Sequence, residues 1–402
     1  MVVAIQSQTK EGSVFGGVLL VAGSCIGAGM LALPVVTGIG GFVPSCIMFL
    51  LAWLFMTTTG LLLLEANLTL GHNLSLISIA EKTLGKIGKA LCWILFIFLF
   101  YSLNIAYIDA SGSILKDILA DLFDIQIASW VGSTLFTLTF GIVIFIGTQH
   151  VDYLNRLLML GLTLAYCVLV ILGSLHINST YLLIHHMKYA VLALPVLIIS
   201  FGFHNMVPSL AMYFKGDRSR LRLAVLIGSS IPLVVYLIWE AVMLGIIPIE
   251  GREGLHYALN HGQAATEALR SVVGHSWINA VAQLFALFAI VTSFLAQSLS
   301  LVDFLADGLK VTKVGMKRVG LILLTLIPPF IFAFLFPGIF IRALGLAGGF
   351  SAVILFGIMP ALMIWILKKR RVGTSLFLGL VLLVAVAIFF LELMQELGVL
   401  QR

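Results

Sequence analysis

The chain has 402 residues, of which 61% are hydrophobic and only 10% are charged, and its formal net charge is +6. Soluble domains contain about 25% charged residues, so this composition leaves too little polar surface for a soluble protein of such length. It predicts an all-α polytopic membrane protein surrounded by the lipid bilayer. The positive charge does not indicate a nucleic-acid partner, because the basic residues lie in short segments between the apolar ones.

Apolar segments of about 20 residues, the length at which a helix crosses a bilayer, recur along the whole chain. Eleven are expected, at residues 13–37, 42–66, 87–110, 131–148, 152–175, 188–214, 223–248, 279–305, 317–336, 343–367 and 373–396. They predict a single domain over residues 1–402. The longest connections are residues 67–86 and 249–278. Residues 263–273, within the second, have a helical pattern and are expected to form a lid over the outer mouth.

The distribution of Lys and Arg predicts the orientation, because cytoplasmic loops of membrane proteins carry most of these residues. With the N-terminus in the cytoplasm, only six of the 23 basic residues fall outside: Lys116, Lys188, Arg252, Arg270, Arg342 and Arg402. The opposite orientation reverses this bias. We therefore expect a cytoplasmic N-terminus and a C-terminus on the outer side.

The four cysteines are scattered through apolar stretches, at Cys25, Cys46, Cys92 and Cys167. They form no CxxC pair and no cluster with histidine, which are the spacings typical of metal or redox sites. We expect buried thiols, with no disulfide framework, no metal and no cofactor.

The first apolar segment is predicted to interrupt its own helix. Gly23, Gly27 and Gly29 fall within seven residues near its middle, and Pro34 follows. Each interior glycine costs a helix about 1 kcal/mol relative to alanine, and proline removes a backbone donor. A break at membrane depth is tolerated only where it faces protein or a water-filled cavity. The alternative is close helix packing, since small residues four apart let two helices approach.

A second interruption is expected in the sixth segment, which carries Gly202, His204, Asn205 and Pro208 near mid-membrane. Buried polar side chains are costly there and indicate a functional site by default. Five segments per repeat is an odd number, so a second copy would enter from the opposite face. We therefore predict an inverted repeat. Repeat one would cover residues 13–176, repeat two residues 188–367, and residues 373–397 would be an appended eleventh span.

Two adjacent breaks offer both poles of a helix dipole, roughly +0.5 of a charge at the free amides and −0.5 at the free carbonyls. This arrangement suits a zwitterion. We expect the amides of Gly27, Ala28 and Gly29 to receive a carboxylate. The carbonyls near Ala22, Gly23 and Phe201 would receive an ammonium group.

Two other segments contribute polar candidates. Phe100, Asn104, Tyr107 and Ser111 recur at three- and four-residue intervals and share one helix face, which suits a ring with a polar tip. The alternative for this face is an interhelical hydrogen bond. The adjacent hydroxyls of Thr292 and Ser293 either coordinate a sodium ion or bond back to their own helix.

His204 and Glu240 are the candidates for proton coupling. Glu240 lies deep in the seventh segment, where an ionised carboxylate costs a few kcal/mol and the protonated acid is favoured. Histidine changes its charge near neutral pH. The alternative for Glu240 is a neutral side chain hydrogen-bonded to a neighbouring helix.

Residues 12–35, GSVFGGVLLVAGSCIGAGMLALPV, resemble the first span of the hydroxy/aromatic amino acid permeases. These are the tyrosine- and tryptophan-specific transport proteins of bacterial inner membranes, in the amino acid/polyamine/organocation superfamily. The core IGAGMLALP, residues 26–34, is the most specific part, although residues 35–42 space their Gly and Phe differently. Residues 105–115, 200–210, 231–240 and 291–309 add to the similarity, which covers essentially the whole chain.

The resemblance implies a five-plus-five inverted-repeat fold with an eleventh helix, and proton-coupled import of an aromatic amino acid across a bacterial inner membrane, with the C-terminus in the periplasm. Motif match and the patterns above together give the expected substrate-binding residues: Ser24, Gly27, Ala28, Gly29, Phe201, Gly202, Phe203, Asn104 and Tyr107. The candidates for ion or proton coupling are His204, Glu240, Thr292 and Ser293. Relatives close to these permeases carry a neutral residue where Glu240 stands, so a proton role for it would be particular to this chain.

Tyrosine is favoured over tryptophan as the substrate. The nearest rival is a sodium-coupled symporter of the same fold, with the ion at the carbonyls near Ala22 and Cys25 and at Thr292 and Ser293. A passive channel or exchanger is a second rival, although no ring of like charge repeats in the sequence. An integral membrane enzyme would need a catalytic cluster such as HExxH, which the sequence lacks.

Overall fold

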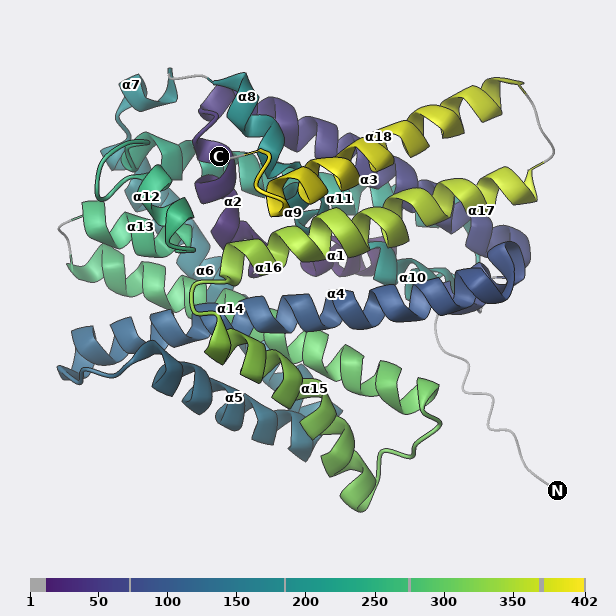
Figure 1. Ribbon diagram of the computed structural model, residues 1–402, viewed down its shortest axis with the longest axis horizontal. Coiled ribbons are helices and arrows are strands. Elements are labelled where there is room, and N and C mark those ends of the chain that lie inside the picture. The colour runs from purple at the N-terminus through teal and green to yellow at the C-terminus, as the bar shows by residue number, and fades with distance from the viewer. Residues whose placement is uncertain (1–11, 72–73, 184–185, 274–275, 369–371, 401–402) are drawn as a thin grey trace.

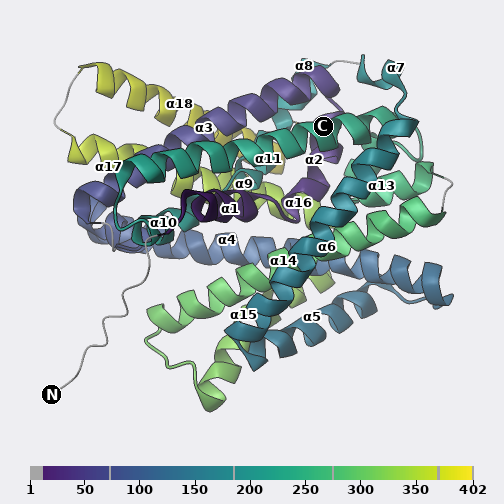
Figure 2. The ribbon, with the colours of Figure 1, turned by 180° about the vertical axis from the view of Figure 1, so that it is seen from behind.

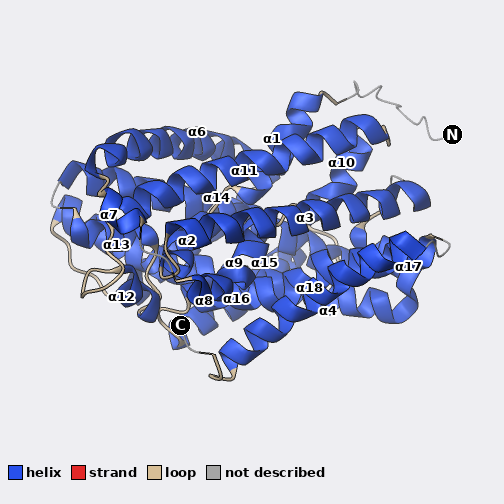
Figure 3. Ribbon diagram, turned by 90° about the horizontal axis from the view of Figure 1, so that it is seen from above, coloured by secondary structure: helices blue, strands red, loops and turns tan. Residues whose placement is uncertain are grey.

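The computed structural model describes residues 12–71, 74–183, 186–273, 276–368 and 372–400, and within these ranges the chain is helical without any strand (Figure 3). The helices are α1 Val14–Cys25, α2 Gly29–Gly38, α3 Phe42–Leu70, α4 Leu76–Phe123, α5 Ser129–Ile146, α6 Thr148–Gly173, α7 Ser179–Leu182, α8 Met187–Ala190, α9 Leu194–Ser200, α10 Val207–Tyr213, α11 Arg218–Ile246, α12 Leu255–Asn260, α13 Ala265–Val272, α14 Ser276–Gly308, α15 Gly315–Leu335, α16 Phe340–Leu346, α17 Met359–Leu367 and α18 Val372–Glu396. A π-helical stretch, Ala347–Ile358, joins α16 to α17.

The eleven predicted spans are accounted for. Among the described residues, ten helices are long and apolar enough to cross a membrane, and α1 with α2 forms a further bent pair. Figure 1 shows α3, α4, α17 and α18 running lengthwise through one part of the molecule, and Figure 2 shows α11 beside α3. In the reverse view α6 crosses α14, with which it is in contact (Figure 2). The fold is therefore an all-α bundle of membrane-spanning length.

The first and sixth spans run antiparallel and touch at both ends. Where α1 begins, the backbone N–H of Gly12 donates to the Tyr213 carbonyl at 3.2 Å. At the opposite end, the N–H of His186 donates to the Gly40 carbonyl at 2.7 Å. These contacts bring the two predicted interruptions to the same level of the bundle.

One segment is longer than predicted, and one predicted helix in a connection is confirmed. The third span was expected at residues 87–110, but α4 runs from Leu76 to Phe123 and turns at Gly85, whose φ of +73° is readily accessible only to glycine. Polar residues at both ends extend a helix beyond its apolar part, which hydropathy alone does not reveal. The connection 249–278 contains α12 and α13, so the predicted helix at residues 263–273 is confirmed as Ala265–Val272.

Candidate functional site

The first interruption lies between Cys25, where α1 ends, and Gly29, where α2 begins, and the chain bends there by 57°. The amide of Ala28, in the middle of the break, donates to Ser293 Oγ of α14 at 2.9 Å. A Cβ atom added to Gly27 would lie only 2.4 Å from the same oxygen. The break is therefore shaped around the Ser293 hydroxyl, and glycine is needed at position 27 for this approach.

The second interruption follows α9, which ends at Ser200, and precedes α10, which begins at Val207. A short 3-10 turn, His204–Met206, fills part of the gap. A Cβ atom added to Gly29 would lie 3.0 Å from Ser200 Oγ, so the two breaks lie side by side. The prediction that both helices are discontinuous at one level is confirmed by this geometry.

A cavity of about 140 Å³ lies against the two breaks. An engineered protein cavity of about 150 Å³ holds a benzene ring, so this volume matches a single aromatic ring. Of the predicted residues, eight line it: Ser24, Gly27, Ala28, Gly29, Tyr107, Gly202, Thr292 and Ser293. The cavity is thus built from backbone of the first break, from residues of the second break, from the third span and from α14.

Phe201 and Phe203, predicted to bind substrate, do not line the cavity. Both rings are buried in the protein core, with 0% and 1% of their surface exposed. The Phe201 ring packs against Phe49 and Tyr236, at centroid distances of 6.4 and 5.3 Å. The interrupted backbone turns these rings away from the cavity, and only Gly202 between them reaches it.

Asn104 also lies outside the cavity. Its side-chain oxygen accepts a hydrogen bond from Ser298 Oγ of α14 at 2.9 Å, and the residue is fully buried. This contact matches the alternative of an interhelical hydrogen bond. Tyr107, one turn further along α4, does line the cavity, and its hydroxyl faces Ser293.

Neither of the two proton-coupling candidates lines the cavity. Glu240 of α11 is fully buried, and its carboxyl group accepts a hydrogen bond from the Thr37 hydroxyl near the end of α2. His204 is also fully buried, with Nε2 3.0 Å from Thr59 Oγ1 and its ring stacked on Phe356 at 4.8 Å. Glu240 therefore contacts the interrupted first span directly, whereas His204 is fixed by α3 and by the π-helical stretch.

The Thr292 and Ser293 hydroxyls have separate roles. Thr292 Oγ1 donates to the Phe288 carbonyl of its own helix at 2.8 Å, which matches the alternative stated for it. Ser293 accepts from the Ala28 amide across the break. The pair thus joins α14 to the first break through Ser293.

The cavity also contains residues that were not among the predicted substrate-binding residues. They are Asn155 and Met159 of α6, Asn205 and Met206 within the second break, and Gln297 and Ser300 of α14. The side-chain oxygens of Asn155 and Asn205 are buried without a hydrogen-bond partner in the described protein. Asn205 was noticed as a polar residue at membrane depth. Asn155 follows the charged residue Asp152 so closely that hydropathy places it at a segment end.

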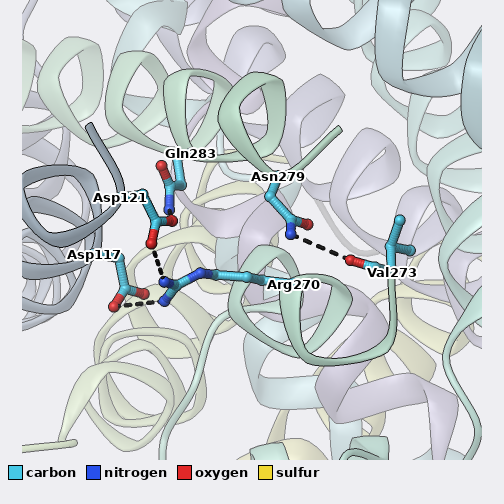
Figure 4. A network of polar contacts seen from close by, with 6 residues as sticks. All are labelled: Asp117, Asp121, Arg270, Val273, Asn279 and Gln283. Carbon is cyan, nitrogen blue, oxygen red and sulfur yellow. Dashed lines mark hydrogen bonds and ion pairs between the residues drawn. The ribbon is translucent and has the colours of Figure 1, made fainter. Parts of the chain in front are cut away.

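The predicted lid is attached to the end of α4 (Figure 4). Arg270 of α13 makes ion pairs with Asp117 at 2.8 Å and Asp121 at 2.5 Å, and Gln283 donates to Asp121 at 2.7 Å. Burial alone would lower the pKa of Arg270, but Asp117 and Asp121 raise it above its ordinary value. Glu267, also on α13, has its pKa raised to about 8, first by burial and then by Asp117.

A second, polar cavity of about 670 Å³ lies under this loop, lined by residues that include Asp109, Asp117, Glu267 and Arg270. Both α12 and α13 contact α2. The loop therefore rests on the half of the first span that follows the break.

A bundle of membrane-spanning helices, with two spans interrupted at one level beside a small cavity, is the architecture of a membrane transporter. The sequence signature of the tryptophan/tyrosine permease family matches residues 10–394, and the chain belongs to this family. It is therefore a permease and not an enzyme.

Three relatives illustrate the similarity. The "Tyrosine-specific transport system 1" of Haemophilus influenzae is 35% identical over 369 residues, which cover 90% of this chain and 89% of the relative. The "Tryptophan-specific transport protein" of the same organism is 33% identical over 89% of this chain and 88% of the relative. The "Tryptophan-specific transport protein" of Pseudomonas aeruginosa is 32% identical over 92% of this chain and 90% of the relative.

Proposed function

We propose that this permease imports an aromatic amino acid, with tyrosine favoured, across the inner membrane of a bacterium by proton symport. The observation that carries the proposal is the cavity between the two interrupted spans, with its backbone-rich wall and its ring-sized volume. Relatives named for tyrosine or tryptophan transport give the chemical class of the substrate.

Different residues of the cavity suit the carboxylate, the ring and the polar hydrogen atoms of the proposed substrate. The peptide groups at Gly27 and Gly29 border the cavity and suit the carboxylate, while the Ala28 amide already donates to Ser293. Met159 and Met206 border the cavity and suit the ring, since thioethers make favourable contacts with aromatic edges. The unpartnered amide oxygens of Asn155 and Asn205 suit N–H or O–H donors of the substrate.

The proposed orientation places the N-terminus in the cytoplasm and the C-terminus in the periplasm, as the positive-inside rule favours. In that orientation the cavity extends toward the cytoplasm, because Asn155 lies near the start of α6 and Ser300 near the end of α14. The inverted repeat of residues 13–176 and 188–367 remains a proposal, supported by the antiparallel contact of the first and sixth spans.

We assign proton coupling to Glu240 in preference to His204. The Glu240 carboxyl contacts Thr37 of α2, so its protonation changes a contact to the element that borders the break. Its second oxygen, Oε2, is buried without a hydrogen-bond partner in the described protein, which favours the neutral acid in the present conformation. Loss of that proton would then favour a conformation in which the carboxylate is hydrated.

Uptake into proteoliposomes with separately imposed gradients tests the coupling ion. Accumulation of labelled tyrosine under a proton gradient without sodium is the expected result. Accumulation that needs a sodium gradient would instead support the sodium-coupled rival, and equal exchange without any gradient would support the exchanger.

A competition panel of the common amino acids against labelled tyrosine tests the substrate. Tyrosine and tryptophan are expected to compete, and aliphatic and charged amino acids are expected not to. Efficient competition by leucine or lysine would contradict an aromatic substrate.

A further inference from the structure

The carbonyl ends of two half-helices converge on one hydroxyl group. Helix α1 ends at Cys25 and α9 ends at Ser200, so these carbonyls lie at the negative ends of both helices. Tyr236 Oη of α11 lies 2.6 Å from the Cys25 carbonyl oxygen and 3.0 Å from that of Ser200. One buried oxygen atom therefore bridges the two breaks.

The Tyr236 ring is held in this position on several sides. It is fully buried and packs against Phe201 at 5.3 Å and Phe49 at 6.1 Å between ring centroids. One turn further along α11, Trp239 Nε1 donates to the Met30 carbonyl at 3.1 Å, just beyond the first break. The hydroxyl therefore cannot leave the two carbonyls by a simple side-chain rotation.

Two carbonyl oxygens at helix ends, close to one point, form an environment that attracts a cation. In discontinuous transporter helices, such carbonyl ends coordinate sodium or protons. A phenol is neutral and has one proton, so it can donate fully to only one of the two carbonyls at a time. It nevertheless fills the position with an oxygen atom and excludes an ion from it.

We propose that the Tyr236 hydroxyl is a built-in substitute for a monovalent metal cation between the two breaks. It is a positioning residue: it holds the ends of α1 and α9 together beside the cavity without contacting it. The inference rests on the proposed function only in taking the cavity beside the two breaks as the substrate site. It does not depend on the role assigned to Glu240.

Removal of the hydroxyl tests the proposal. In Tyr236→Phe the two carbonyls lose their donor, and a space for a small cation opens between them. In choline chloride, we expect substrate-free Tyr236→Phe to unfold at a lower temperature than the unmodified protein. Sodium chloride at the same concentration is expected to raise the thermal unfolding midpoint of this variant by at least about 2 °C. We expect tyrosine affinity to fall up to about tenfold in choline and to recover in sodium.

Tyr166→Phe is the matched control. Its hydroxyl donates to the Val235 carbonyl of α11 at 2.9 Å and to neither of the carbonyls that Tyr236 bridges. This variant loses the same atom and one hydrogen bond, so its midpoint is expected to fall without any response to sodium. A similar response to sodium in Tyr166→Phe and Tyr236→Phe, or none in either, would overturn the proposal.

A second variant covers the case in which Tyr236→Phe does not fold in either salt. In Tyr236→Lys a flexible ammonium group of similar reach can donate to both carbonyls. Folded, sodium-independent protein supports the proposal, whereas loss of folding in both variants but not in Tyr166→Phe contradicts it.

The two proposals fail in different ways. Unmodified protein that binds no aromatic amino acid would refute the proposed function, while the melting experiment needs no substrate. Unmodified protein whose midpoint rises with sodium as much as that of Tyr236→Phe would refute the inference alone.

Discussion

The two interruptions lie side by side but are built in opposite ways. The first contains the small residues Gly27 and Ala28 beside Ile26, and its peptide groups form part of the cavity wall. The second is flanked by Phe201 and Phe203, whose rings are buried in the core, and it contributes to the cavity mainly through residues just outside the aromatic pair. One break thus presents backbone to the cavity, and the other is anchored by its side chains.

The difference shows what the glycines near the first break are for. Among the described residues, a Cβ atom at Gly23 would meet no atom within 4 Å beyond its own stretch of helix, while one at Gly27 would meet Ser293 Oγ at 2.4 Å. At the start of the span, by contrast, a Cβ atom at Gly12 or Gly16 would collide with the Tyr213 side chain. The glycines at the start of the first span therefore allow close packing against the sixth span, and Gly27 at its middle shapes the break. Both interpretations of the glycines, helix packing and an interrupted helix, apply at different positions of the segment.

The largest expected effect comes from filling the first break. Gly27→Leu places a side chain where the Ser293 hydroxyl meets the Ala28 amide, so uptake is expected to fall at least about 100-fold, as when a reacting geometry is displaced by an ångström. Uptake of labelled tyrosine into proteoliposomes measures it. Gly379→Leu on α18 is the control and is expected to keep its activity, because an added Cβ there would meet no atom of the described part of the chain within 4 Å beyond its own stretch of helix. Full uptake by Gly27→Leu would show that this break does not bind substrate.

The next effect concerns coupling to the half-helix that follows the first break. Glu240→Gln keeps the shape of the side chain beside Thr37 but cannot exchange a proton. We expect tyrosine exchange to stay within about twofold of the unmodified protein, and accumulation driven by a pH gradient to fall about tenfold or more. The paired variant His204→Gln is expected to retain coupled accumulation. The reverse pattern would move the proton role to the second break.

The anchoring of the second break is tested by stability. Phe201→Ala empties a fully buried site beside Tyr236 and is expected to cost about 3–5 kcal/mol of unfolding free energy. Thermal unfolding of purified protein measures the loss. Phe332→Ala provides the control, because Phe332 is 52% exposed on the outer surface of α15. Equal losses in the two variants would mean that Phe201 is no more of an anchor than a surface ring.

The smallest effect concerns the loop above the first break. The raised pKa of Glu267, about 8 against an ordinary value of 4.5, means that the docked loop binds a proton that the undocked loop releases. Docking should therefore be constant below about pH 4.5, weaken as pH rises toward 8 and level off above it. Hydrogen exchange of residues 265–272, corrected for intrinsic rates, measures this. Glu267→Gln should abolish the slope, and an unchanged slope in that variant would assign it to another group.

Much of the fold was predictable because membrane spans are long apolar runs, and breaks in them need glycine or proline. The eleven spans, both interruptions and the helix Ala265–Val272 in the connection 249–278 were correctly predicted. The family resemblance is confirmed by the sequence comparisons.

The direction of side chains at the breaks was not predictable. Phe201 and Phe203 lie in a motif beside Gly202, but an irregular backbone has no fixed period, so sequence spacing cannot say which residue faces the cavity. The bridge made by Tyr236 was missed for a related reason. A tyrosine in an apolar helix looks like a core residue, and its partners are carbonyls, which every residue has.

The end contacts between the first and sixth spans limit how the transporter moves. Tyr213 is seated against Gly12 at one end, and at the other the Gly40 carbonyl is bound by the His186 amide, next to Ala190. While both end contacts are kept, the two spans can only bend near their middle or move together as a rigid body. Opening of the cavity to each side of the membrane in turn would therefore bend the joined spans at their middle or rotate them as one unit against the surrounding helices. The other possibility is that one of the two end contacts breaks in each transport cycle.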